Sequence, residues 1–150
     1  MMDAQAVRKL LSSGALLFDG ATGTYAKSLP GWPDGPVELA CTDAAHKVRA
    51  LHKAYLDAGC GAIKTNTFAA HIGFAAESVE QQLGLVRGAV EAARDAAGDQ
   101  AAVFADIGPA PASCDAAKAY MQLADAFLNL GVSCFLFETM PSSEIGRAHV

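Results

Sequence analysis

The sequence predicts an α/β fold in which helices connect the strands of a parallel sheet. Two observations predict it: short apolar segments of strand length alternate with longer segments of helical periodicity, and each helical segment ends at a glycine. Such alternation is typical of parallel sheets joined by right-handed crossover connections. A third observation concerns function, because each apolar segment ends in polar residues.

Four short, mostly apolar segments have the length and composition of strands that are covered on both faces. They are residues 15–19, 62–67, 102–107 and 134–139. Because a helical pattern lies between each pair, we expect four parallel strands in chain order.

Helical patterns precede the first strand and separate the others. The first covers residues 4–13, with Asp3 as its expected N-cap. The second begins at Thr42, the third at Ser78 with the spacing of a capping box, and the fourth near Asp115. The glycines expected to end these helices are Gly14, Gly59, Gly98 and Gly131.

Composition and charge argue against several classes of protein. The chain has 150 residues, a formal net charge of −5 and 52% hydrophobic residues, which excludes intrinsic disorder and weighs against nucleic-acid binding. No apolar run approaches the roughly 18 residues of a membrane span, and the N-terminus lacks a signal-peptide stretch. The widely spaced cysteines form no CxxC pair, which predicts free thiols in the cytoplasm; they are Cys41, Cys60, Cys114 and Cys134.

The predicted strands become polar at their C-terminal ends. Asp19 and Gly20 end the first strand, residues 64–67 the second, Asp106 the third and Glu138 the fourth. In a parallel α/β fold these ends meet on one rim, where ligands bind. We therefore expect one shared polar site, although any one of these acids could instead cap a helix or pair with a lysine.

Residues 19–24 combine an aspartate with two glycines, which let backbone amides approach a carboxylate or a phosphate. The segment lacks the ending of a P-loop and the spacing of the dinucleotide fingerprint, and a plain tight turn fits it equally well. Asp19 and Glu138 could accept hydrogen bonds from an ammonium group while the amides near Gly20 hold a carboxylate. These two charges together describe an amino acid.

Other chemically active residues give weaker signals. His46 and His52 lack the i, i+4 spacing of a metal pair and are expected to be exposed or capping. His71 could face the rim, without a second metal ligand near it in sequence. Cys60 and Cys134 lie at strand entrances and are expected to be small buried hydrophobes. The irregular segment 28–39, rich in proline and glycine, is expected to cover a site.

Five segments in chain order resemble the homocysteine S-methyltransferase family, and together they extend over residues 16–140. The form Asp-Ile-Gly-Pro at residues 106–109 looks most like the homocysteine-binding module of cobalamin-dependent methionine synthase. Betaine-dependent and S-methylmethionine-dependent enzymes are close relatives, so the methyl donor stays open. The five segments are residues 17–24 (LFDGATGT), 48–59 (VRALHKAYLDAG), 65–68 (TNTF), 104–109 (FADIGP) and 137–140 (FETM).

The resemblance implies the N-terminal half of a (β/α)8 TIM barrel, with four parallel strands. It implies methyl transfer to the homocysteine thiolate to make methionine, with methylcobalamin or methyltetrahydrofolate as the methyl source and cobalamin held by a separate domain. By the same resemblance Asp19 and Glu138 hold the substrate amino group, the turn at Gly20 and Ala21 meets its carboxylate, and Asn66 lies nearby.

The family's zinc ion is held by three cysteines on later strands, so none of the cysteines of this chain is expected to be a ligand. We expect the truncated chain to be inactive alone, with neither nucleic acid nor membrane as a partner. Residues 1–143 are expected to form the partial barrel. Residues 144–150 read as a non-native tail, because EIGRAHV is what a widely used sequencing adapter encodes in one frame; a native short tail is the alternative.

Two other functions remain open. One is a freestanding amino-acid-binding protein built on a half barrel, which would bind homocysteine or methionine without zinc. The other is a half barrel that dimerises and binds phosphate at its glycine turn.

Overall fold

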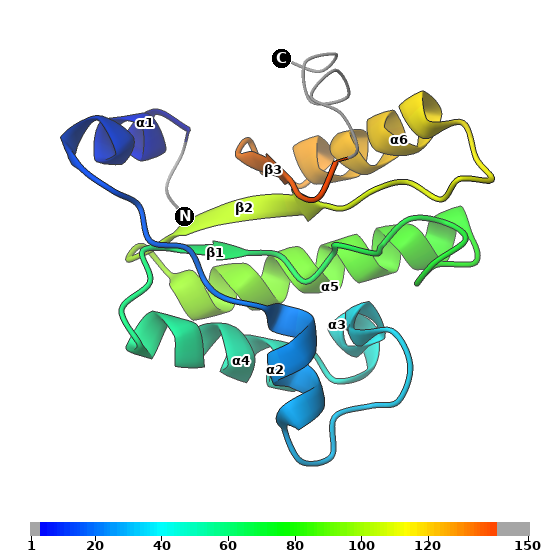
Figure 1. The fold of residues 1–150 in the computed structure, drawn as a ribbon, viewed down its shortest axis with the longest axis horizontal. Coiled ribbons are helices and arrows are strands. Elements are labelled where there is room, and N and C mark those ends of the chain that lie inside the picture. Colours follow the sequence, from blue (N-terminus) through cyan, green and yellow to red (C-terminus); the bar gives the residue numbers. More distant parts are fainter. Residues whose placement is uncertain (1–3, 141–150) are drawn as a thin grey trace.

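The computed structural model describes residues 4–140, which form helices around a small parallel sheet (Figure 1). The expected N-cap Asp3 and the proposed tail at 144–150 lie outside these residues. In chain order the elements are α1 (Ala4–Ser13), α2 (Thr22–Ser28), the 3-10 helix η1 (Val37–Leu39), α3 (Ala40–Asp43), α4 (Ala45–Asp57), β1 (Ala62–Lys64), α5 (Val79–Ala97), β2 (Ala102–Ile107), α6 (Ala116–Asn129) and β3 (Phe135–Phe137).

The sheet has the order β1-β2-β3, and both pairings are parallel. Ala62 pairs with Ala102 and Ala105 pairs with Phe135, so β2 is the central strand. Helix α5 packs against β1 and β2 and also against α4, while α6 packs against β2. Figure 1 shows α4 and α5 side by side below the sheet and α6 above it. The alternation of strands and helices read from the sequence is therefore present.

The prediction of a strand at residues 15–19 is wrong, and the described residues form three strands instead of four. Phe18 makes a single parallel bridge to Ala62, and the amide of Asp19 donates to the carbonyl of Ala62 at 3.0 Å. Leu17 is 64% exposed, so its side chain gains little from the sheet. The chain then leaves the sheet and enters α2 at Thr22, which limits the pairing to one bridge.

The helix predicted from Thr42 is two helices, because Ala44 takes a non-helical conformation (φ −147°, ψ 43°) between α3 and α4. Helix α2 is also absent from the sequence prediction, which reads its first residues as a glycine turn. The cap predicted at Ser78 is confirmed, and the last helix begins near Asp115 as expected, with Asp115 as its N-cap. The side chain of Ser78 accepts from the amide of Gln81, and that of Asp115 accepts from the amide of Lys118.

The core lies between the sheet and its helices. Its largest cluster joins side chains of β2, α5 and α6, including Ile107, Val86 and Phe127. The expectation that His52 is exposed or capping is wrong: its side chain is fully buried on α4, and neither ring nitrogen has a hydrogen-bond partner. Burial lowers the pKa of His52 to about 4, so the ring is neutral at physiological pH. It packs there as a core side chain.

His46 is exposed, as expected, whereas His71 is buried under the loops. Cys134 is buried and Cys60 is half-buried at the strand entrances. Across residues 4–140, no helix has both the length and the apolar character needed to cross a membrane.

Candidate functional site

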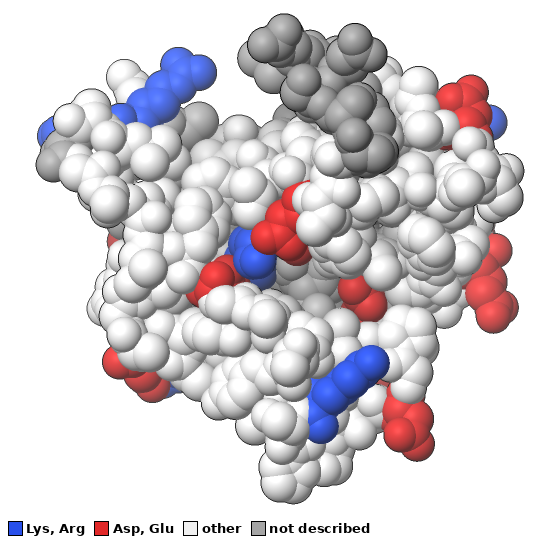
Figure 2. Space-filling view, viewed as in Figure 1, with Lys and Arg blue, Asp and Glu red and all other residues white. Residues whose placement is uncertain are grey.

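A pocket of about 210 Å³ lies at the C-terminal ends of the strands. Figure 2 shows it as a hollow in which acidic residues surround basic atoms. Its wall is formed by the start of α2, by the 3-10 helix η1, by the C-terminal ends of β1 and β2, and by the residues that follow β1 and β3. The lining residues are Ala21, Thr22, Gly23, Val37, Glu38, Lys64, Thr65, Asn66, Thr67, Phe68, Asp106 and Glu138.

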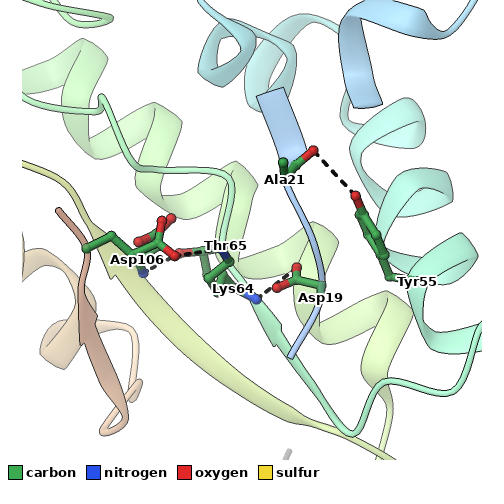
Figure 3. Close-up of polar contacts among 7 residues, drawn as sticks. Asp19, Ala21, Tyr55, Lys64, Thr65 and Asp106 are labelled. Atoms are coloured by element: carbon green, nitrogen blue, oxygen red, sulfur yellow. Dashed lines mark hydrogen bonds and ion pairs between the residues drawn. The ribbon is translucent and has the colours of Figure 1, made fainter. Parts of the chain in front are cut away.

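Lys64 joins the two acids that the sequence analysis placed on one rim. Its Nζ contacts Glu138 Oε1 at 2.7 Å. Its backbone amide donates to Asp19 Oδ2 at 3.2 Å, and Figure 3 shows Lys64 beside Asp19. Residues 19 and 138 therefore meet at one place although they are far apart in the chain. Sequence reasoning noticed Lys64 as part of a polar strand end and did not assign it to the site.

The sheet fixes the backbone of each acid. The amide of Asp19 donates to Ala62 and the amide of Glu138 donates to the carbonyl of Ile107 at 3.1 Å. Directly after Glu138, Thr139 has a φ of 53°, in the left-handed region that a β-branched residue seldom adopts. Backbone strain of this kind is common at binding sites, where the surrounding structure holds it in place.

A chain of hydroxyl groups holds the ends of β1 and β2 together beneath the pocket. Thr67 Oγ1 donates to the carbonyl of Asp106 at 2.7 Å, and Thr65 Oγ1 accepts from the amide of Asp106 at 3.0 Å. Because the single proton of the Thr67 hydroxyl is used in this way, Thr65 is the donor in the 2.7 Å contact between the two hydroxyls. Figure 3 shows Thr65 between Lys64 and Asp106.

The site contains more acidic groups than basic ones, and the pKa values of two of its aspartates are raised toward neutral pH. Burial raises the pKa of Asp19 to about 6, against the opposing effect of its bond from Lys64. Burial, reinforced by the charge of Glu138, raises the pKa of Asp106 to about 7. Burial alone would lower the pKa of Lys64, but its hydrogen bond and ion pair with Glu138 outweigh that effect and raise it. The lysine is therefore charged, and the pocket attracts further positive charge.

Asn66 lies in the pocket, as expected, and holds the segment before α3. Its Nδ2 donates to the carbonyl of Val37 at 2.8 Å. Glu38 is buried beside it and accepts from the amide of Ala69 at 2.9 Å. Glu38 was missed because it lies in an irregular segment with no pattern to mark it. The predicted covering role of residues 28–39 is met in part, since Val37 and Glu38 line the pocket.

The glycine turn is placed partly as expected. Ala21 and Gly23 line the pocket, and Gly20 lies against Tyr55, whose hydroxyl donates to the carbonyl of Ala21 at 3.4 Å. A Cβ at position 20 would approach the Tyr55 hydroxyl to 3.0 Å, so a side chain there would push the aromatic ring away.

The cysteines do not converge on this pocket as a set. No group of three or more His, Cys, Asp or Glu that could hold a metal ion occurs among residues 4–140. Cys41 Sγ donates to the carbonyl of Asn66, and burial raises the pKa of Cys41 to about 12, so its thiol is protonated. A metal-binding thiol must instead be deprotonated.

Comparisons with known proteins identify a family and a fold. A family model described as homocysteine S-methyltransferase matches residues 16–150. The fold resembles solved structures of the homocysteine methyltransferase MmuM from Escherichia coli in oxidized, metallated and apo forms. Their TM-scores are 0.76, 0.70 and 0.68, and the sequence identities are 23%, 21% and 24%.

The alignments cover 95%, 93% and 95% of this chain but 62%, 59% and 59% of those proteins. The chain therefore spans less than two thirds of their length, and at this identity the likeness establishes the fold. A search of curated protein sequences gave no match.

Proposed function

Because this chain belongs to the homocysteine S-methyltransferase family, we propose that it forms the amino-acid-recognising part of an enzyme that methylates homocysteine to make methionine. The observation that carries this proposal is the meeting of Asp19 and Glu138 at Lys64, in a pocket with an excess of carboxyl groups. Such a pocket favours an ammonium group. The α-amino group of homocysteine supplies one.

The proposed roles follow from the positions of the side chains. Asp19 and Glu138 attract the ammonium group, and the backbone of the turn at Gly20 and Ala21, of which Ala21 lines the pocket, would meet the carboxylate. Asn66 shapes the pocket through its bond to Val37. In this orientation the two charges of the amino acid are bound, and the side chain with its thiol is left free to project from the strand ends.

The zinc ion expected from the family does not fit the described part of this chain. Cys41 is protonated and buried, and residues 4–140 offer no cluster of metal ligands. One of the solved relatives exists in a metallated form. We therefore propose that any thiolate-activating metal is held by residues beyond 4–140, and that this chain is inactive alone.

The remaining proposals concern architecture and setting. We propose the N-terminal half of a (β/α)8 barrel, with residues 15–19 in the place of the first strand, supported by the Phe18 bridge to Ala62. Residues 1–143 would belong to it and residues 144–150 to a non-native tail.

The Asp-Ile-Gly-Pro form at 106–109 supports an enzyme of the methionine synthase type, with methyl groups delivered by methylcobalamin or methyltetrahydrofolate. Free thiols at the described cysteines support a cytoplasmic setting.

The acidic pocket bears on one of the two alternatives left open by the sequence, the phosphate-binding half barrel. Phosphate binding is disfavoured, because Asp19, Glu38, Asp106 and Glu138 gather around a single lysine, Lys64. A freestanding amino-acid-binding protein would use the same pocket and differs in lacking any transfer chemistry.

Isothermal titration calorimetry of the 150-residue chain with L-homocysteine tests the proposal, with inorganic phosphate as the competing ligand. We expect saturable binding of L-homocysteine in the absence of metal and none of phosphate. Asp57→Asn provides a matched control, because Asp57 is an exposed aspartate paired with Lys53 on α4. Binding of phosphate in place of the amino acid would contradict the proposal.

A further inference from the structure

The carboxyl group of Asp106 lies in the pocket without a role in the scheme above. Asp106 ends the central strand β2, and its side chain is 5% exposed. Its amide and carbonyl are both held by hydroxyls of the segment after β1, those of Thr65 and Thr67. The backbone that carries the carboxyl group is therefore held in place, and the carboxyl group faces the same cavity as Lys64 and Glu138.

The hydrogen bonds of the three acids differ. Glu138 Oε1 is engaged by the ammonium of Lys64, and Asp19 Oδ2 is engaged by the amide of Lys64. In contrast, Oδ1 of Asp19 and Oδ1 of Asp106 are buried without a hydrogen-bond partner. Buried carboxylate oxygens are nearly always hydrogen-bonded, and an unpartnered one lowers stability. Among these three acids, the unsatisfied buried acceptors therefore belong to Asp19 and Asp106, and of these two residues Asp106 lines the pocket.

We infer that Asp106 is a further substrate-positioning residue, which accepts a hydrogen bond from the ligand's primary ammonium group together with Asp19. The inference rests on the proposed function and names the chemistry by which the pocket selects its ligand. Lys64 holds Glu138 in place through the contact between its Nζ and Glu138 Oε1.

Selectivity follows from the number of protons on the ligand nitrogen. A primary ammonium has three N–H donors and can bond to carboxylates on different sides, whereas a trimethylammonium has none. An analogue that lacks the amino group cannot satisfy either open oxygen. The pocket thus favours a free α-amino acid over N-methylated or des-amino analogues of the same length.

The charge of the pocket makes this selection depend on pH. Burial first, and then the charge of Glu138, raise the pKa of Asp106 to about 7, and burial raises that of Asp19 to about 6. The charged groups that face Asp106 from the packed elements are Lys64, Glu138, Asp19 and Glu38. Below pH 6 the protonated aspartates attract a cation weakly, so the preference for an ammonium ligand should grow as pH rises from 5.5 to 7.5.

The test is calorimetric titration of the 150-residue chain and of Asp106→Asn with L-homocysteine and with its des-amino analogue, 4-sulfanylbutanoate. We expect Asp106→Asn to weaken L-homocysteine binding about tenfold, the loss of one charge-assisted hydrogen bond, and to leave 4-sulfanylbutanoate unchanged. Asp125→Asn, an exposed aspartate on α6, is the matched control. Circular dichroism and urea unfolding verify that each variant is folded.

Equal weakening of both ligands by Asp106→Asn would indicate a structural role and overturn the inference. If the variant does not fold, the titration of the parent chain with both ligands tests the inference. A preference for L-homocysteine over 4-sulfanylbutanoate that stays constant between pH 5.5 and 7.5 also overturns the inference. Binding of L-norleucine but not L-homocysteine, weakened by Asp106→Asn, would defeat the proposed function and leave the inference intact. A parent chain that binds no amino acid defeats both.

Discussion

Strand β2 has a neighbour on each edge, whereas residues 15–19 meet the sheet through one bridge at Phe18. In β2 the side chains of Val103, Ala105 and Ile107 are all buried, while Leu17 is 64% exposed. Both segments are short and apolar, so composition does not distinguish them. A long strand therefore forms where neighbours pair with both edges of an apolar segment, as in β2, and composition alone does not predict its length.

The largest test of this comparison uses two phenylalanines whose rings pack edge to face with centroids 6.2 Å apart. Phe127 on α6 is fully buried against the central strand, whereas Phe135 on β3 is half-buried at the edge. Phe127→Ala should lower the free energy of unfolding by about 3–5 kcal/mol, and Phe135→Ala by clearly less. Urea unfolding followed by circular dichroism measures both. Equal losses would remove the distinction between centre and edge.

The second test concerns Asp106, the buried acid at the end of the central strand. Its pKa is about 7 in the folded chain against an ordinary value of 3.8, so folding favours the protonated form. The resulting stability is fully present below about pH 4 and is lost as pH rises through about 7.

Replacing Asp106 with Asn keeps the side chain neutral at every pH. At pH 8 Asp106→Asn should therefore exceed the parent in free energy of unfolding by about 2–4 kcal/mol, from roughly 1.4 kcal/mol for each pKa unit. The two proteins should converge toward pH 4. A constant difference from pH 4 to 8 would mean that Asp106 does not titrate in this range.

The third test compares two glycines on α5. A Cβ at Gly88 would lie closer than 3.0 Å to the carbonyl oxygen of Cys41, where α3 meets α5, whereas a Cβ at Gly84 meets Thr42 at an ordinary 3.8 Å. Gly88→Ala should lower the free energy of unfolding by about 1–3 kcal/mol. Gly84→Ala should raise it by up to about 1 kcal/mol, because alanine favours helix. Thermal unfolding distinguishes them, and a stabilised Gly88→Ala would show that the two helices can separate without loss.

The sequence was informative where local chemistry decides the structure. The Ser78 cap was visible because a polar side chain stands at capping-box spacing before an amphipathic helix, and the start of the last helix near Asp115 was visible from its periodicity. The full length of β2, 102–107, was predicted because it is a continuous, mostly apolar segment, of which every residue except the half-buried Phe104 is buried. Residues 15–19 were mistaken for a strand because exposure of Leu17 depends on contacts that a local pattern does not encode.

The candidate site was also predictable in part, where the local sequence marks its residues. Asp19, Asn66 and Glu138 were marked by strand ends that turn polar, and the structure brings them to one end of the sheet. The partner that links the two acids, Lys64, and the free oxygen of Asp106 emerge only from tertiary geometry. His52 shows the same limit, because a single histidine on a helix gives no sign of which face is buried.

The central claim is that carboxyl groups from separate strand ends form one binding site for the amino group of an amino acid. A crystal structure of the chain soaked with L-homocysteine tests it most directly. We expect the ligand nitrogen within about 3 Å of carboxylate oxygens of Asp19 and Asp106, with Lys64 still bound to Glu138. A ligand whose carboxylate binds Lys64 while its nitrogen points into solvent would show that these carboxyl groups do not bind the amino group.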